Sequence, residues 1–201
     1  SGSLFAHAVA LRLETDDDLA GAWSWAQRHK ARTLQERMLG PGETRPAFAA
    51  PDLATFQRRI LRPGEVFLDL VSGERTGVLF CVMPDTALAA RLPGRQATAS
   101  ILRRLADVVR SRAIDDPTPA QDLAARAVSA WPAVARRLAA DADAVAWCPD
   151  GVWHQLPAAL LPWRGELSRV PAAGILAFLR RQPQGQPATA SILAVAGAAP
   201  G

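Results

Sequence analysis

Two apolar runs separated by a short polar turn constrain the fold of this chain most strongly. The first, RPGEVFLDLV, spans residues 62–71, and the second, RTGVLFCVMPD, spans residues 75–85. Ser72-Gly73-Glu74 between them is a turn sequence, so the pair predicts a β-hairpin. A third apolar run, DAVAWC at residues 143–148, predicts a buried strand.

Helical patterns fill the sequence between these strands. Apolar spacing predicts helices over residues 96–112 and 119–140, and Pro132 should kink or restart the second because proline lacks a backbone donor. Pro171 marks the start of a helix with the sequence AAGILAFLRR, and ILAVAG at 192–197 predicts a strand that is apolar on both faces. Alternating strands and helices predict an α/β sheet.

The N-terminal part is predicted to be helical. Residues 4–13 predict the end of one helix, and a second begins near Leu19 and stops at Gly40-Pro41-Gly42. Because Trp25 projects away from the main apolar stripe of this second helix, we expect the helix to bury two faces. The proline-rich segment 41–52 predicts a linker, followed by a short helix at 53–60.

Composition excludes several classes of protein. With 201 residues, 49% of them hydrophobic and 21% charged, the chain predicts a globular fold with its own core. The net charge is +4, and the pI of about 10.3 reflects arginine, since Lys30 is the only lysine. The arginine pairs are scattered along the chain rather than clustered, which disfavours a nucleic-acid partner.

Neither cysteine chemistry nor membrane insertion is indicated. Cys81 and Cys148 form no disulfide framework, so we expect a reducing, cytoplasmic location. Histidine and cysteine spacing predicts no metal site, and we expect no cofactor. No apolar run approaches 18 residues, which predicts no membrane partner. The chain starts with Ser1-Gly2-Ser3, and we expect it to be part of a larger protein.

Cys148 and His154 raise the question of a nucleophile and its base. If residues 149–151 form a hairpin tip, the two side chains are diagonal neighbours about 7–8 Å apart. A thiolate–imidazole pair needs hydrogen-bond reach, about 3 Å. We therefore interpret the segment as a structural turn in which Gly151 takes a positive φ and Cys148 is a core residue. A self-contained Cys148 hydrolase remains the least favoured reading.

The same segment resembles a known family. VAWCPDGVWHQLPAALLP is similar to the PDG-x-[LW]-H-x-[LI]-P-x-x-x-L motif of CHAT domains, the caspase-like domains associated with tetratricopeptide repeats (TPR). The matching positions, which we interpret as a structural turn, are Pro149, Asp150, Gly151, His154 and Pro157.

Four further segments resemble CHAT proteins in the family's order. Residues 22–39 resemble the helix that closes the repeat array, whose A-E-x-x-K-A-R-x-L pattern is matched by Lys30 and Arg32. The predicted hairpin resembles the family's first hairpin, and LSRVPAAGILAFLRR resembles its Y-x-P-S-x-x-x-L helix, with Ala172 where serine is usual. SILAVAGAAP resembles the first strand of the caspase-like core, so the match covers about residues 14–201.

The resemblance implies both an architecture and a role. Residues 1–48 are expected to be a TPR-like end or connector, and residues 49–201 the N-terminal part of a CHAT domain with an incomplete caspase/separase-like sheet. The family's catalytic His-Gly and later cysteine lie downstream, and no histidine here precedes glycine. The chain itself is thus expected to be inactive. The expected partners are the rest of the peptidase, its repeats and its protein substrate.

Two questions stay open at the level of sequence. The alternative function is a non-enzymatic protein-interaction or scaffold module with a TPR-like end. Lys30 lies inside the apolar stripe of its predicted helix. Its stem either snorkels along that stripe with the ammonium in water, or its ammonium pairs with Asp69 or Glu65 of the first strand.

Overall fold

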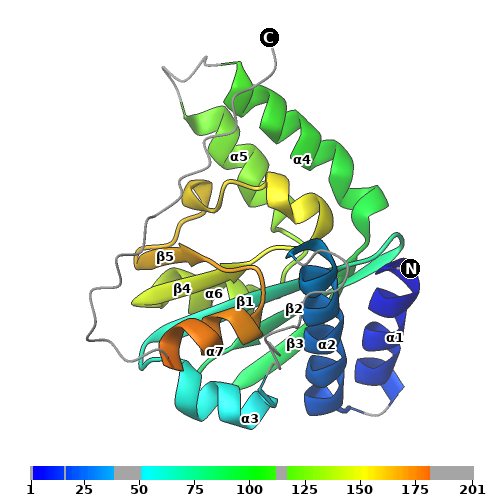
Figure 1. Cartoon of the computed structure of the whole chain (residues 1–201). Helices are drawn as coiled ribbons and strands as arrows, with labels where there is room; N and C mark the ends of the chain where they lie inside the picture. The colour runs from blue at the N-terminus through cyan, green and yellow to red at the C-terminus, as the bar shows by residue number, and fades with distance from the viewer. Residues whose placement is uncertain (1, 16, 39–50, 112–116, 182–201) are drawn as a thin grey trace.

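A five-stranded mixed sheet forms the centre of the molecule in the computed structural model, which describes residues 2–15, 17–38, 51–111 and 117–181. The strand order is β3-β2-β1-β4-β5 (Figure 1). The strands are β1 (Glu65–Ser72), β2 (Thr76–Val82), β3 (Ala87–Pro93), β4 (Ala144–Cys148) and β5 (Glu166–Arg169). Helices cover both faces of the sheet, so the predicted α/β class is confirmed at this level.

The sheet joins an antiparallel half to a parallel half. β1 pairs antiparallel with β2, as the hairpin prediction required, and the Gly73 amide donates to the Thr76 carbonyl across the turn at 3.0 Å. β2 continues antiparallel to β3, whereas β1–β4 and β4–β5 are parallel pairs. The carboxyl ends of β1 and β4 consequently lie at the same edge of the sheet.

One face of the sheet is covered by the middle of the chain. It carries α4 (Arg95–Arg110), α5 (Thr118–Ala127), α6 (Ala133–Asp141) and the short 3-10 helices η2 (Gly151–Gln155) and η3 (Ala158–Leu160). The helix predicted over 119–140 is two helices, because Pro132 occupies the N-cap of α6 and restarts it.

The opposite face is covered by both ends of the described chain. It carries α1 (Gly2–Thr15), α2 (Leu19–Met38), α3 (Leu53–Thr55) running into a π-helical turn, η1 (Phe56–Ile60), and α7 (Ala173–Arg181). Trp23 of α2 packs against Phe56, Phe67 and Phe80, with ring centroids 5.1–5.9 Å apart. The two N-terminal helices thereby contribute to the same apolar cluster as the sheet.

Two features of the fold differ from the predictions, and a further group of predictions concerns residues that the structure does not describe. Trp25 is 43% exposed, so the second buried face of α2 is wrong at that residue; its ring stacks on Phe5 at 6.1 Å. The strands β3 and β5 were not predicted. Residues 41–50 of the predicted linker (41–52), the predicted Gly40-Pro41-Gly42 helix stop and the predicted strand at 192–197 fall outside the described residues.

Candidate functional site: a buried charged cluster

Strand alternation places a carboxylate inside the apolar core. Val66, Leu68 and Leu70 of β1 face the α4–α6 side, whereas Phe67 and Val71 face α2. Successive side chains of a strand point to opposite faces, so Asp69 points toward α2. It is fully buried, and its register partner on β4 is Cys148.

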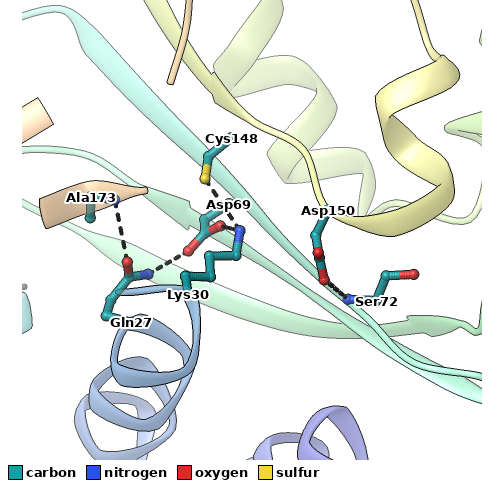
Figure 2. Close-up of polar contacts among 7 residues, drawn as sticks. All are labelled: Gln27, Lys30, Asp69, Ser72, Cys148, Asp150 and Ala173. Carbon is teal, nitrogen blue, oxygen red and sulfur yellow. Dashed lines mark hydrogen bonds and ion pairs between the residues drawn. The ribbon is translucent and has the colours of Figure 1, made fainter. Parts of the chain in front are cut away.

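Two side chains of α2 bind this carboxylate (Figure 2). Gln27 and Lys30 lie on one side of the helix because residues three apart are neighbours on a helix surface. The amide of Gln27 donates to Asp69 Oδ2, and the ammonium of Lys30 donates to Asp69 Oδ1 and, at 3.2 Å, to Cys148 Sγ. The Gln27 carbonyl oxygen accepts from the Ala173 amide at 3.3 Å, so α7 joins the cluster.

Charge and burial fix the protonation of the cluster. Burial is the largest single influence on the pKa of Lys30 and lowers it, but the surrounding acidic groups, Asp69 foremost, together outweigh burial, and the pKa is raised overall. Burial, followed by the charge of Asp69, raises the pKa of Cys148 well above the ordinary range of a thiol. Lys30 is therefore an ammonium and Cys148 an S–H, which is a poor nucleophile.

Of the two alternatives for Lys30, the ion pair is confirmed. Lys30 is only 9% exposed and is paired with Asp69, so the snorkelling alternative is wrong. The other candidate partner, Glu65, pairs instead with Arg180 through two contacts of 2.6 Å and accepts from the Arg62 amide. Arg32, the other residue of the helix motif, is exposed.

The Pro-Asp-Gly turn is fixed to the end of β1. The amide of Ser72 donates to Asp150 Oδ2 at 2.7 Å, and Gly151 has a φ of +55°, as predicted from the turn sequence. The segment then enters η2, so the hairpin used to place Cys148 against His154 is wrong. Local 3-10 hydrogen bonds, such as Trp153 N to the Asp150 carbonyl, replace the cross-strand ladder.

Cys148 and His154 take different partners. Cys148 is buried and contacts Lys30, whereas His154 is exposed and its Nδ1 lies 2.5 Å from a guanidinium nitrogen of Arg169. Pro149 is buried, and Asp150 and Pro157 are half-buried. Cys81 is also buried, which raises its pKa to about 12. Neither thiol is suited to nucleophilic catalysis.

A small pocket opens beside the buried cluster. It has a volume of about 150 Å³ and is lined by residues of α2 and of the turn after β4, including His29, Lys30, Thr33, Asp150 and His154. Ligand sites of α/β proteins commonly lie at the carboxyl ends of parallel strands, which is where this pocket is. Sequence reasoning missed Gln27 and Ser72; the only signal for Gln27 was its position three residues before Lys30.

The fold and the site define an α/β protein with a mixed sheet. A buried ion pair lies between α2 and the sheet, near the carboxyl ends of the parallel strands β1 and β4. Within the described ranges, no helix is both long and apolar enough to cross a membrane. The chain matches no protein-family model, and no curated protein or solved structure matches it significantly.

Proposed function

We propose that this chain is the N-terminal, non-catalytic segment of a CHAT-type cysteine peptidase, linking TPR-like helices to a protease core. One observation carries the proposal. Lys30, in the segment that resembles the family's array-closing helix, contacts Cys148, which directly precedes the family-like Pro-Asp-Gly turn. Lys30 and Cys148 are 118 residues apart in sequence, and their contact brings the two family-like segments together in one buried cluster.

The chemistry of the cluster supports a mechanical role rather than a catalytic one. A buried ion pair is costly to break from one side, because the abandoned charge stays away from water. The Lys30–Asp69 pair therefore resists sliding or rotation of α2 over the sheet. A displacement applied to α2 is passed to the ends of β1 and β4, instead of being absorbed by loose packing.

In the proposed peptidase the chemical step belongs to residues outside this chain. A thiolate paired with histidine attacks the peptide carbonyl, the C–N bond breaks, and the amine leaves with a proton from the histidine; water then hydrolyses the thioester and regenerates the thiol. The segment described here supplies support for that site and a rigid connection to the repeats.

Reading the gene beyond codon 201 tests the proposal directly. We expect a strand followed by His-Gly and, after a later strand, a cysteine. A reading frame that lacks both would overturn the peptidase assignment. In the full peptidase, Lys30→Met should weaken the response to the activating signal, whereas Arg28→Met, which removes an exposed cation from the same helix, should not.

A specific surface feature favours the alternative of a protein-interaction module. Phe178 and Leu179, adjacent residues of α7, are exposed apolar side chains, 44% and 58% exposed. Apolar surface of this kind commonly marks a protein contact. A frame without catalytic residues would leave this alternative as the function of the chain.

A further inference from the structure

A second pocket lies on the face of the sheet opposite the Lys30 cluster. It has a volume of about 140 Å³ and lies between the α5–α6 connection and the segment after η3. Its walls include Val128, Trp131, Leu161 and Trp163, and Arg136 of α6 also lines it. The pocket is thus largely apolar and aromatic, with one cation.

Trp131 carries an unmet hydrogen bond. The residue is 3% exposed, and its indole nitrogen has no hydrogen-bond partner within the described part of the chain. Its ring packs against Trp147 and Trp153, each with centroids 5.7 Å away. A buried donor without an acceptor is costly and rare in native proteins. Because Trp131 also lines the pocket, a ligand oxygen that reached the indole nitrogen would satisfy this donor.

The other lining residues define the rest of that ligand. The guanidinium of Arg136 is exposed and suits a carboxylate, which it can bind through two parallel hydrogen bonds. An apolar cavity of about 150 Å³ accepts a group of the size of benzene. Trp163 and Leu161 offer such a group aromatic and aliphatic contacts.

We propose that this pocket binds an apolar carboxylate with a phenyl-sized side group, whose oxygens accept from Trp131 Nε1 and Arg136. Because the indole nitrogen is sealed from solvent, binding requires a shift of neighbouring side chains. The ligand is either a small aromatic acid or the free C-terminus of a peptide that ends in an aromatic residue. The proposal is independent of the peptidase assignment.

Indole resonances provide the test. The chain has six tryptophans, and ¹⁵N labelling gives one NMR signal for each indole N–H group. The signal that disappears in Trp131→Phe is that of Trp131. Phenylacetate should move that signal downfield and saturably, with a dissociation constant on the order of 1 mM. Arg136→Gln should weaken binding about tenfold, whereas Arg137→Gln, an exposed neighbour on α6, should leave it unchanged.

Two further arms identify the source and can overturn the proposal. A short peptide ending in phenylalanine should bind with its free carboxylate and not as the amide. If it binds more tightly than phenylacetate, the ligand is a chain end; if more weakly, it is a small acid. No saturable shift at ten times the expected dissociation constant, or equal binding by both arginine variants, would refute the site.

Discussion

Lys30→Met removes the charge of the buried cluster and keeps most of the side chain's apolar stem. Asp69 then remains a fully buried carboxylate, and among the described side chains of α2 it keeps only Gln27 as a donor. Breaking one side of a buried pair typically costs about 3–5 kcal/mol. For a chain of this size, that corresponds to a fall in melting temperature of roughly 6–20 °C.

The assay is equilibrium unfolding in urea at neutral pH, followed by circular dichroism. Arg28→Met is the matched control, because it removes an exposed cation from the same helix and should change the free energy of unfolding by less than about 0.5 kcal/mol. The double variant Lys30→Met/Asp69→Leu should recover much of the loss, since no charge is then left buried. Equal effects of Lys30→Met and Arg28→Met would refute the reasoning.

Three further outcomes are expected. The pKa values of Cys81 and Cys148 are raised from 9.0 and that of Lys30 is raised from 10.5, so the folded state holds protons that the unfolded state releases. Urea titrations should therefore show the free energy of unfolding falling above about pH 9 and falling further above pH 10.5. The second fall should be absent in Lys30→Met. Gly151→Val should lower the melting temperature more than His154→Ala does, because its φ of +55° strains a β-branched residue by about 1–3 kcal/mol; the reverse order in thermal melts would contradict this. The purified chain should hydrolyse no peptide substrate in a thiol-dependent manner, and a thiol reagent should label Cys148 only after denaturation; hydrolysis abolished by Cys148→Ser but not by Cys81→Ser would show otherwise.

The sequence predicts the central strands well and the edge strands poorly. β1 and β2 combine long apolar runs with a polar turn, so local pattern is sufficient to find them. β3 (ALAARLP) and β5 (ELSR) are alanine-rich or short, and they become strands because β2 and β4 offer them unpaired backbone groups. Such pairing depends on tertiary structure and leaves little trace in local sequence.

In the candidate site too, some residues could be predicted from the local sequence and others could not. Lys30 and Asp69 were each conspicuous as a charge within an apolar pattern, so their pairing could be proposed from the sequence. Gln27 and Ser72 are ordinary polar residues whose roles depend on which backbone or carboxylate lies opposite. The conformation after Gly151 was missed because a Pro-Asp-Gly turn can lead into either a second strand or a 3-10 helix.

The residues of the buried cluster are far apart in the sequence, so during synthesis the cluster can form only after its C-terminal members have left the ribosome. Cys148 leaves the ribosome 118 residues after Lys30, which at 5–20 residues per second is a delay of about 6–24 s. Ala173, which donates to Gln27, follows later still, 146 residues behind it. The cluster therefore closes late in synthesis, and until then the apolar stripe of α2 lacks part of its cover.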